Sequence, residues 1–449
     1  MRPSWPAACR SKRSPCRRRL WRECWIKDAT AARRAALRML DAVRAGDTFQ
    51  AARDRALPEL DARDRRLAYE LAAGVLRRRT QLDQALPLAT VDPRLHDVLR
   101  LGVYQLRSLH RVPAYAAVST SVELAREMVG EGGARYVNQA LRKVASARDP
   151  VRGVRASHPE WLLRRWTSRF GEPDTARLIA WNDCKPPLTL QSARWGQGML
   201  TDRLRAAGFG VTEAPFGAGL RLTRAPGTGH LTPRDLPGFS EGAFIVQDPA
   251  HALVCRFAAI DPGVVVYDAC AAPGGKAVVL ERSGVRVVAG EGRRERLHRL
   301  VETTRRAGVA IRGAAADLLS APFRAGAFGA VLVDAPCSAT GTLARHPDAR
   351  WRLTPRRIAR AAERQMALLE AGASLVRFGG LLVYATCSLE PEENDDVVTT
   401  FLARHSEFAR SPATGVVPAE LLTPAGDFRT LPQRDGIDGA FAARLVRRR

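Results

Sequence analysis

The chain has 449 residues and a formal net charge of +25 at pH 7. This length suffices for two to four domains, and an apolar fraction of 46% suffices for buried cores. The excess of basic residues predicts a polyanionic partner, most simply a nucleic acid. Nearly all of the positive charge is arginine, a bias that genome composition can also produce.

The eight cysteines are scattered, with no Cys-x-x-Cys pair and no cysteine/histidine cluster of zinc-finger spacing. This distribution is typical of free thiols in a reducing cytosol rather than of a disulfide framework. The sequence contains no apolar run of transmembrane length, and its first residues do not resemble a secretory signal. We therefore expect a cytoplasmic protein with no membrane segment and no metal site.

The N-terminal part is expected to be helical. Residues 1–28 are basic and have no hydrophobic period, which predicts a disordered extension. Residues 29–147 contain apolar residues at helical spacing between glycine and proline breakers, which predicts an all-α bundle. Its arginines are most simply explained as a solvated face. The predicted helices are Ala31–Arg44, Arg65–Arg79, Arg94–Leu109, Ala117–Val129 and Ala134–Ala147.

Residues 148–243 are predicted to form a small α/β subdomain. It begins with an amphipathic helix at Pro159–Phe170, whose apolar stripe we interpret as core because its spacing is helical. A short strand is expected at Leu188–Gln191. The turn-rich stretch that follows contains a second strand-like segment at Leu220–Leu222.

Residues 244–449 alternate between strand and helix patterns, which predicts a doubly wound, Rossmann-like α/β domain. Ligands bind such sheets at the carboxyl ends of the strands, so polar residues at these ends are the candidate site residues. The predicted strands are Val264–Asp268, Val285–Ala289, Ala310–Gly313, Ala330–Asp334 and Leu381–Thr386, followed by a hairpin at Phe428–Thr430 and Ala440–Leu445.

The first of these strands leads into a glycine-rich loop and then a helix, an arrangement that presents backbone N–H groups to a ligand. It is not a nucleotide P-loop, because that motif requires glycine at the position of Cys270 and Ser or Thr at the position of Ala277. An ordinary strand-to-helix turn is the alternative. The loop comprises Cys270, Ala271, Ala272, Pro273, Gly274, Gly275 and Lys276.

Acidic residues follow the next three strands. Glu291 lies about 20 residues after the glycine turn, where a carboxylate suits hydrogen bonding to ribose hydroxyls. Asp317 follows the third strand and could accept a hydrogen bond from an adenine amino group, although a helix cap explains it nearly as well. Asp334 ends the fourth strand.

Two cysteines, Cys337 and Cys387, follow the fourth and fifth strands, and each is followed by serine with proline nearby. A buried cysteine is usually only a small apolar residue. Two cysteines at the ligand-facing edge of one sheet are harder to explain in this way. They predict a pair of thiols with a functional role.

Three ordered motifs identify the kind of protein that this sequence resembles. They are Asp-Ala-Cys-Ala-Ala-Pro-Gly-Gly-Lys from residue 268, Asp-Ala-Pro-Cys-Ser-Ala-Thr-Gly from residue 334 and Tyr-Ala-Thr-Cys-Ser-Leu-Glu-Pro-Glu-Glu-Asn from residue 384. Together they resemble the Sun family of RNA 5-methylcytosine methyltransferases. Residues 29–147 resemble the NusB-like RNA-binding domain of the members that modify bacterial small-subunit ribosomal RNA. The resemblance covers all but the first 28 or so residues.

The resemblance implies methylation of cytosine C5 in small-subunit (16S) ribosomal RNA, with S-adenosyl-L-methionine as the methyl donor. By resemblance, Cys387 is the nucleophile that adds to C6, Cys337 assists release of the covalent adduct, and Asp334 contacts the base around N3. The cytosine is expected in a single strand or loop, since C6 is not accessible in a stacked helix. A monomer is expected.

The resemblance also implies a set of cofactor contacts. The loop Cys270–Lys276 would approach the methionine part of S-adenosyl-L-methionine, Glu291 the ribose and Asp317 the adenine. Asp334 is counted among the residues that line the same site. The sequence departs from the family pattern in Leu190-Gln191-Ser192-Ala193, Ala277, Gly290-Glu291 and Ala440-Phe441, none of which involves the two cysteines.

Two alternative functions remain open at this stage. The NusB-like domain could belong to a non-catalytic RNA-binding assembly or antitermination factor, but such a protein would have no use for both Cys337 and Cys387. The same chemistry could instead act on transfer RNA or another RNA. A DNA cytosine methyltransferase is disfavoured, because that family lacks the Thr-Cys-Ser found at residues 386–388.

Overall fold

The computed structural model describes residues 15–86, 88, 91–146, 157–223 and 233–448. The chain divides into two units, Met1–Arg169 and Phe170–Arg449. Helix α6 (Glu160–Asp183) crosses this division and has non-helical backbone angles at Gly171, two residues after it. We describe each unit by itself.

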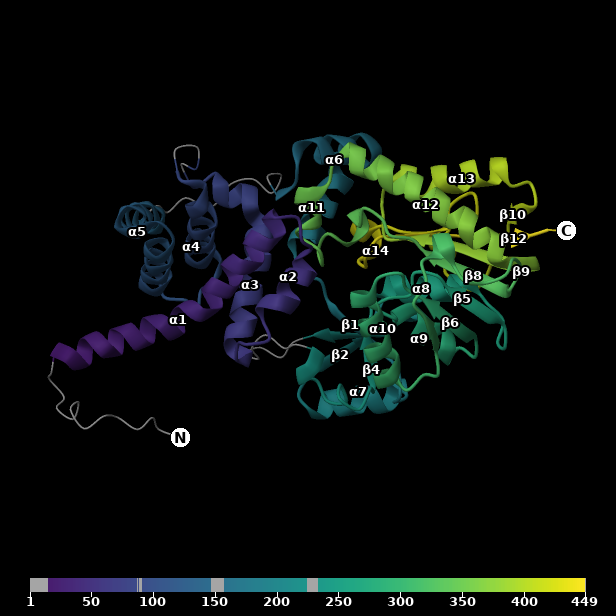
Figure 1. The fold of residues 1–449 in the computed structure, drawn as a ribbon, viewed down its shortest axis with the longest axis horizontal. Coiled ribbons are helices and arrows are strands. Elements are labelled where there is room, and N and C mark those ends of the chain that lie inside the picture. The colour runs from purple at the N-terminus through teal and green to yellow at the C-terminus, as the bar shows by residue number, and fades with distance from the viewer. Residues whose placement is uncertain (1–14, 87, 89–90, 147–156, 224–232, 449) are drawn as a thin grey trace. The chain divides into compact units, whose positions relative to one another are not determined.

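The first unit is all-helical (Figure 1). The N-caps of two helices follow from the sequence: Thr48 accepts a hydrogen bond from the Ala51 N–H, and Asp61 accepts one from the Asp64 N–H. The helices before α6 are α1 (Pro15–Arg44), α2 (Phe49–Ala56), α3 (Ala62–Asp83), α4 (His96–Ser108) and α5 (Ala114–Ser146), with a 3₁₀ turn at Pro93–Leu95.

The predicted helical bundle is confirmed, with three differences. Helix α2 was not predicted, because it is only eight residues long. The last two predicted helices are parts of α5, which is interrupted only at Gly130 (φ 81°). Helix α1 already begins at Pro15, so the second half of the expected disordered extension is helical. The rest of that extension, residues 1–14, and the predicted helix end at residue 147 lie outside the described residues.

The core of the first unit combines apolar packing with one buried ionic contact. Leu71, Val98 and Leu99 are fully buried between the helices. The guanidinium of Arg100 on α4 donates to Asp83 on α3 at 2.6 Å and to Asp97 at 2.8 Å. This contact fixes α3 against α4 at a point where an unpaired charge would be costly.

The second unit contains a small antiparallel sheet with strand order β2-β3-β1-β4. Helix α7 (Gln197–Ala206) packs Leu200 and Leu204 against the same apolar cluster as Leu190 and Phe244 of the sheet. The predicted small α/β subdomain is thus confirmed, with more strands than expected. These are β1 (Leu188–Ser192), β2 (Gly210–Glu213), β3 (Leu220–Thr223) and β4 (Phe244–Val246).

The larger sheet of this unit has the order β10-β12-β9-β8-β5-β6-β7, with β11 paired to β12. The five predicted strands run parallel, and the predicted hairpin is formed by β11 and β12. Strand β12 also lies antiparallel between β9 and β10. The strands are β5 (Val265–Asp268), β6 (Arg286–Gly290), β7 (Arg312–Ala314), β8 (Phe328–Asp334), β9 (Val376–Thr386), β10 (Phe408–Arg410), β11 (Phe428–Thr430) and β12 (Ala440–Arg447).

Alternating residues of the strands feed two separate cores, as the period of a strand requires. Val266 and Leu332 pack on the face covered by α8 and α9, whereas Tyr267 and Val333 pack on the face covered by α12 and α13 (Figure 1). This double cover is the doubly wound architecture that the sequence predicted. The helices are α8 (Pro249–Ala258), α9 (Gly275–Arg282), α10 (Arg294–Ala307), α12 (Pro355–Leu375) and α13 (Asp395–Arg404).

Arginines tie the small sheet to the larger one by donating to backbone carbonyls. Arg194 Nε donates to the Arg306 carbonyl at the end of α10 at 2.9 Å, and Arg306 Nη1 donates back to the Phe244 carbonyl at 2.9 Å. Arg221 Nη2 donates to the Gly436 carbonyl at 2.9 Å. Because these contacts lie on different elements, the small sheet is held as a fixed part of the unit.

A buried arginine performs the same task for the end of α6. Arg350 lies in the short helix α11 (Ala349–Arg352) and is fully buried. Its guanidinium donates to Asp183 Oδ1 and to the Asn182 carbonyl, each at 2.9 Å. Removing one partner of such a pair leaves the other charge without compensation.

We expect Arg350→Met to lower the free energy of unfolding by about 3 kcal/mol, since it strands Asp183 and leaves carbonyl groups without donors. For a unit of this size the melting temperature would fall by roughly 6 to 12 °C. Arg356→Met, at an exposed position of α12, is the matched control and should leave melting unchanged. Equal melting of the two variants, measured by calorimetry, would contradict this role for Arg350.

Candidate active site

The candidate site lies where the connections of the parallel sheet change direction. From β5 the chain proceeds through β6 to β7 on one side, whereas β8 and β9 lie on the other side of β5. Ligands bind at the carboxyl ends of the strands at such a switch point. All the residues singled out from the sequence lie at this edge: at the end of β8, in the first turn of α9, or in the loops after β5, β6, β7, β8 and β9.

The glycine-rich loop turns directly from β5 into α9. Gly274 has φ 104° and precedes the first residue of α9, a backbone conformation that favours glycine. The loop is fixed from both sides: the Ala271 N–H donates to the Gly290 carbonyl at 3.0 Å, and Arg296 Nη2 donates to the Ala272 carbonyl at 2.7 Å. The loop is therefore a preformed cradle.

Lys276 at the end of this loop points into the protein. Its ammonium group lies 2.6 Å from Asp334 Oδ2 and 3.1 Å from His251 Nδ1. Burial disfavours the charged form of Lys276, but the carboxylate of Asp334 outweighs this effect and raises the pKa of Lys276. Burial and the charge of Lys276 lower the pKa of His251, so this histidine accepts the hydrogen bond as a neutral ring.

Two buried carboxylates are incompletely hydrogen-bonded within the described residues. Neither oxygen of Asp268 accepts a well-formed hydrogen bond from the described residues, and burial together with Asp334 raises the pKa of Asp268 to about 7. Glu291 accepts from the Arg293 N–H through Oε1 at 3.0 Å, while its Oε2 lies 3.4 Å from Arg296 Nε, an ion pair without a well-formed hydrogen bond. Such groups suit a ligand that offers hydroxyl or ammonium donors.

Asp317 lies beside Glu291 but is more exposed. Its Oδ1 accepts from the Leu319 N–H at 3.1 Å and caps a 3₁₀ turn at Leu318–Ser320. Asp317 therefore acts as the cap that the sequence analysis offered as an alternative. A Cβ atom built on Gly292 would lie 3.3 Å from the Asp317 Cα atom, so the ends of β6 and β7 approach closely. The carboxylate remains available to a ligand at this edge.

The structure brings the two cysteines that follow β8 and β9 into contact. The Sγ atoms of Cys337 and Cys387 are 3.1 Å apart, and both residues are partly buried. The hydrogen bond with Cys387, followed by burial, raises the pKa of Cys337 well above its usual value. Either thiol can be the donor of this hydrogen bond.

Backbone contacts hold the loop of Cys337 against the loop of Cys387. The Gly341 N–H donates to the Cys387 carbonyl at 3.0 Å, and the Gly439 N–H donates to the Gly341 carbonyl at 2.8 Å. A Cβ atom at position 341 would lie 2.5 Å from the Gly439 oxygen and 2.8 Å from the Cys387 oxygen. Only glycine fits at position 341, between the carbonyl oxygens of Gly439 and Cys387.

Two residues of the site were not singled out from the sequence. Arg345 donates to Asp248 and to Asp438, each at 2.6 Å, and so joins three distant segments at the base of the site. Glu393 accepts hydrogen bonds from Ser338 and Ser388, the neighbours of the two cysteines. In the sequence, Glu393 lay within the motif that was assigned to Cys387. Arg345 lay only near the motif that starts at residue 334.

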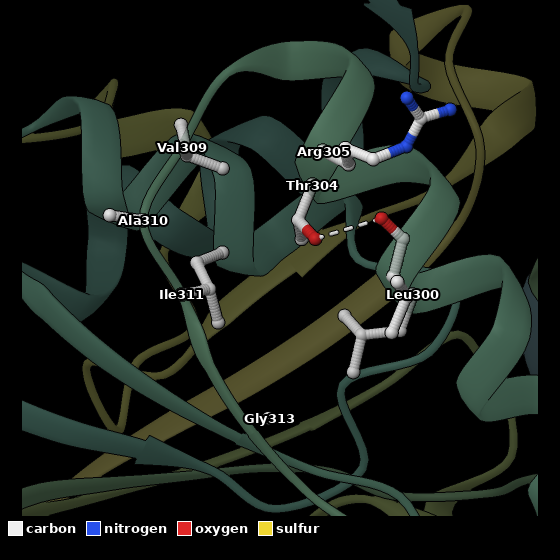
Figure 2. A pocket seen from close by; sticks show the side chains of 8 residues that line it. Leu300, Thr304, Arg305, Val309, Ala310, Ile311 and Gly313 are labelled. Atoms are coloured by element: carbon white, nitrogen blue, oxygen red, sulfur yellow. Dashed lines mark hydrogen bonds between the residues drawn. The ribbon is translucent and has the colours of Figure 1, made fainter.

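A separate pocket of about 340 Å³ lies between α10 and β7 (Figure 2). Its lining is mostly apolar, and the Thr304 hydroxyl is occupied by a hydrogen bond to the Val301 carbonyl at 3.2 Å. None of the residues discussed above lines this pocket. It is therefore distinct from the candidate site.

Two further features bear on the sequence-based expectations. Within the described ranges, no group of three or more His, Cys, Asp or Glu side chains is arranged to hold a metal ion. No described helix is both long and apolar enough to cross a membrane.

Three family profiles match successive parts of the chain. The NusB family matches residues 30–146, and a ferredoxin-like domain of the RsmF/B methyltransferases matches residues 158–227. The family described as 16S rRNA methyltransferase RsmB/F matches residues 258–446. The last range includes both cysteines and the glycine-rich loop.

Curated relatives are similar along nearly the whole chain. A probable ribosomal RNA small subunit methyltransferase B of Synechocystis is 34% identical over 92% of this chain and 99% of its own. Ribosomal RNA small subunit methyltransferase B of Xylella fastidiosa (strain 9a5c) is 37% identical over 87% of this chain and 94% of its own.

Among solved structures, PH0851 has the same fold, with a TM-score of 0.76 and 23% identity, over 92% of this chain and 98% of that one. These similarities confirm the family resemblance drawn from the motifs. The chain belongs to the 16S rRNA methyltransferase RsmB/F family, together with the ribosomal RNA small subunit methyltransferases B.

Proposed function

We propose that this protein methylates C5 of a cytosine in 16S ribosomal RNA, with S-adenosyl-L-methionine as the donor, through a covalent adduct between Cys387 and C6 of the base. The observation that carries this proposal is the contact between Cys337 and Cys387, whose sulfurs are 3.1 Å apart. The names of the curated relatives support small-subunit ribosomal RNA as the substrate.

The proposed reaction explains why a nucleophile is needed. C5 of cytosine is too weak a carbon nucleophile to accept a methyl group directly. When the thiolate of Cys387 forms a bond to C6, the C5=C6 double bond is lost, the N–C4–C5 unit becomes enamine-like, and C5 can attack the methyl group. Thiolate is the nucleophilic form of cysteine, and a hydrogen bond donated by Cys337 across the 3.1 Å contact would stabilise that form.

Asp334 is the residue assigned to the base itself. Attack at C6 moves negative charge toward N3 of the pyrimidine, and Asp334 would contact the ring there as a carboxylic acid that donates to N3, since a carboxylate would oppose this charge. The ammonium group of Lys276, 2.6 Å from Asp334, adds a positive charge at this position. A fixed charge of this kind stabilises the transition state without further reorganisation of the site.

Release of the product requires the second cysteine. After methyl transfer the proton on C5 passes to a water molecule, the C–H electron pair forms the C5=C6 double bond, and the electron pair of the C6–Sγ bond returns to Cys387. The thiol of Cys337 lies next to the departing sulfur and can donate a hydrogen bond as the thiolate forms again. The contact between Cys337 and Cys387 would thus assist both the attack on C6 and the release of the product.

The residues around the glycine-rich loop fit the proposed cofactor. S-adenosyl-L-methionine supplies an electrophilic methyl group. The backbone of Cys270–Lys276 would hold its methionine part, Glu291 its ribose and Asp317 its adenine. The oxygens of Asp268, and Oε2 of Glu291, which has only the ion pair with Arg296 at 3.4 Å, match ligand groups that donate hydrogen bonds. Asp334 would lie where the cofactor and the base meet.

The charge of the chain is consistent with an RNA substrate. A net charge of +25, mostly from arginine, favours contacts with phosphates. The helical N-terminal unit would supply part of that binding surface. The target cytosine must be single-stranded or flipped out of its stack, since the thiolate has to reach C6.

We expect Cys387→Ala to abolish methyl transfer, with a loss of roughly 10³-fold or more, because no other group can form the bond to C6. The measurement is transfer of radiolabelled methyl from S-adenosyl-L-methionine to unmodified 16S ribosomal RNA, with 5-methylcytosine identified in the digest. Cys184→Ala, at an exposed cysteine, is the control and should match wild type. Absence of label with wild type, while RNA binding is intact, would favour a binding factor or another RNA.

We expect Cys337→Ala to form the adduct but release it slowly, since the leaving thiolate loses its donor. The variant should show an RNA-dependent band that resists denaturation on a gel, in the presence of S-adenosyl-L-methionine. Cys337→Ala combined with Cys387→Ala should not form this band. If the single variant shows no such band while wild type methylates normally, Cys337 does not assist release.

A further inference from the structure

We propose that Glu393 is a positioning residue which holds Cys337 and Cys387 in contact by bridging the two loops that carry them. The assignment of catalytic roles to these cysteines rests on the proposed function. The bridge itself is a matter of geometry, and it can be tested without methyl transfer.

The carboxylate of Glu393 is fully buried and contacts the residue next to each cysteine. Oε1 accepts from the Ser338 N–H at 2.8 Å, and Oε2 accepts from the hydroxyls of Ser338 and Ser388. Ser338 follows Cys337 after β8, and Ser388 follows Cys387 after β9. One side chain therefore connects the two loops directly below the pair of sulfurs.

A neighbouring helix fixes the position of this bridge. Gln365 on α12 donates from Nε2 both to Glu393 Oε1 at 2.9 Å and to the Pro336 carbonyl at 3.0 Å. The Tyr384 hydroxyl on β9 donates to the backbone carbonyl of Glu393 at 2.6 Å. The glutamate is thus held by the sheet and by the helix that covers it. It therefore positions the two loops relative to rigid elements.

Every contact to the carboxylate comes from an N–H or O–H donor, so the site requires a group that only accepts. Burial raises the pKa of Glu393, while the hydrogen bonds from Ser338 and Ser388 oppose this effect. No lysine or arginine in the described part of the chain forms an ion pair with it. A buried acid without a cation is costly to maintain. The need to position the loops of Cys337 and Cys387 accounts for this energetic cost.

Other contacts maintain the local fold without Glu393. Thr386 Oγ1 donates to Asn394 Oδ1 at 2.6 Å, and Asn394 Nδ2 donates to the Ser388 carbonyl at 2.8 Å. These bonds close the turn after β9. Removal of the carboxylate should therefore loosen the two serines, which keep only their own hydroxyl contact at 3.1 Å, while the turn and the Gly341–Cys387 backbone bond persist. A shift of about 1 Å between reacting groups can lower a rate by roughly 100-fold.

The first test measures the distance between the sulfurs without reference to activity. The full chain is treated with diamide, which removes two electrons and two protons from a thiol pair, and the Cys337–Cys387 disulfide is quantified by mass spectrometry after digestion. We expect Glu393→Ala to slow this reaction at least about tenfold. Asp396→Asn, which removes an exposed carboxylate three residues away, should match wild type. Equal rates in all three proteins would overturn the proposal.

The second test separates position from stability. With 16S ribosomal RNA and S-adenosyl-L-methionine, Glu393→Ala should lower kcat by roughly 100-fold and leave both KM values within about threefold. Glu393→Gln, which keeps the shape and one acceptor oxygen, should recover part of this loss. A loss that appears in KM, or that follows the melting temperature, would indicate a structural role only.

The two tests also distinguish this proposal from the proposed function. If wild type transfers no methyl group but the disulfide rate still depends on Glu393, the bridge stands and the assigned reaction fails. If Glu393→Ala does not fold, Ser338→Ala and Ser388→Ala each remove one hydroxyl contact to the same carboxylate. Each should slow the diamide reaction, and wild-type rates in both would reject the bridge.

Discussion

The parallel pairing of β8 with β9 is the constraint on which the candidate site depends. The register sets Asp334 opposite Ala385, and the Ala335 N–H continues the ladder to the Ala385 carbonyl at 2.8 Å. Cys337 and Cys387 then leave the sheet at the same level, although they are 50 residues apart in sequence. A shift of one residue in this register would turn every side chain of β9 to the opposite face. The contact between the sulfurs is therefore a consequence of how the whole sheet is built.

The edge of the sheet that carries these cysteines also concentrates buried charge. Asp268, Lys276, Asp334 and Glu393 all lie in or next to the loops after β5, β8 and β9. Buried ionic and polar groups of this kind do not by themselves favour folding. The two apolar cores on either face of the sheet offset the free-energy cost of burying these groups. Perturbed carboxyl groups in such a place are typical of functional sites.

The sequence predicted the strands well because their apolar runs and the polar residues that end them are local signals. Cys337, Cys387 and Asp334 were located at one edge by this reasoning alone. Helix α2 and the early start of α1 were not predicted, since the first is short and the second begins in a stretch without a hydrophobic period. These boundaries depend on helix propensity and packing rather than on pattern.

The roles of Arg345 and Glu393 could not be predicted from local pattern. Arg345 meets Asp248 and Asp438, which are 97 and 93 residues away in the chain. Glu393 stood within a motif that was read for its cysteine, and its partner Ser338 is 55 residues distant. Contacts of this range are fixed by the topology, which the period of a single strand does not specify. Asp317 is the opposite case. Its role as a helix cap could be recognised from neighbouring residues, whereas contact with a ligand depends on the assembled sheet.

The two thiols have nearly the same sequence context, since each is followed by serine, yet the structure makes them different. The hydrogen bond with Cys387 and burial raise the pKa of Cys337, and the charge of Glu393 acts in the same direction. In the proposed reaction Cys337 acts as the thiol that donates, and Cys387 as the sulfur that receives the hydrogen bond. A reaction in which one sulfur attacks and must later leave requires this asymmetry. Two equivalent thiols would compete for the base, whereas a fixed donor beside a single acceptor assists both steps.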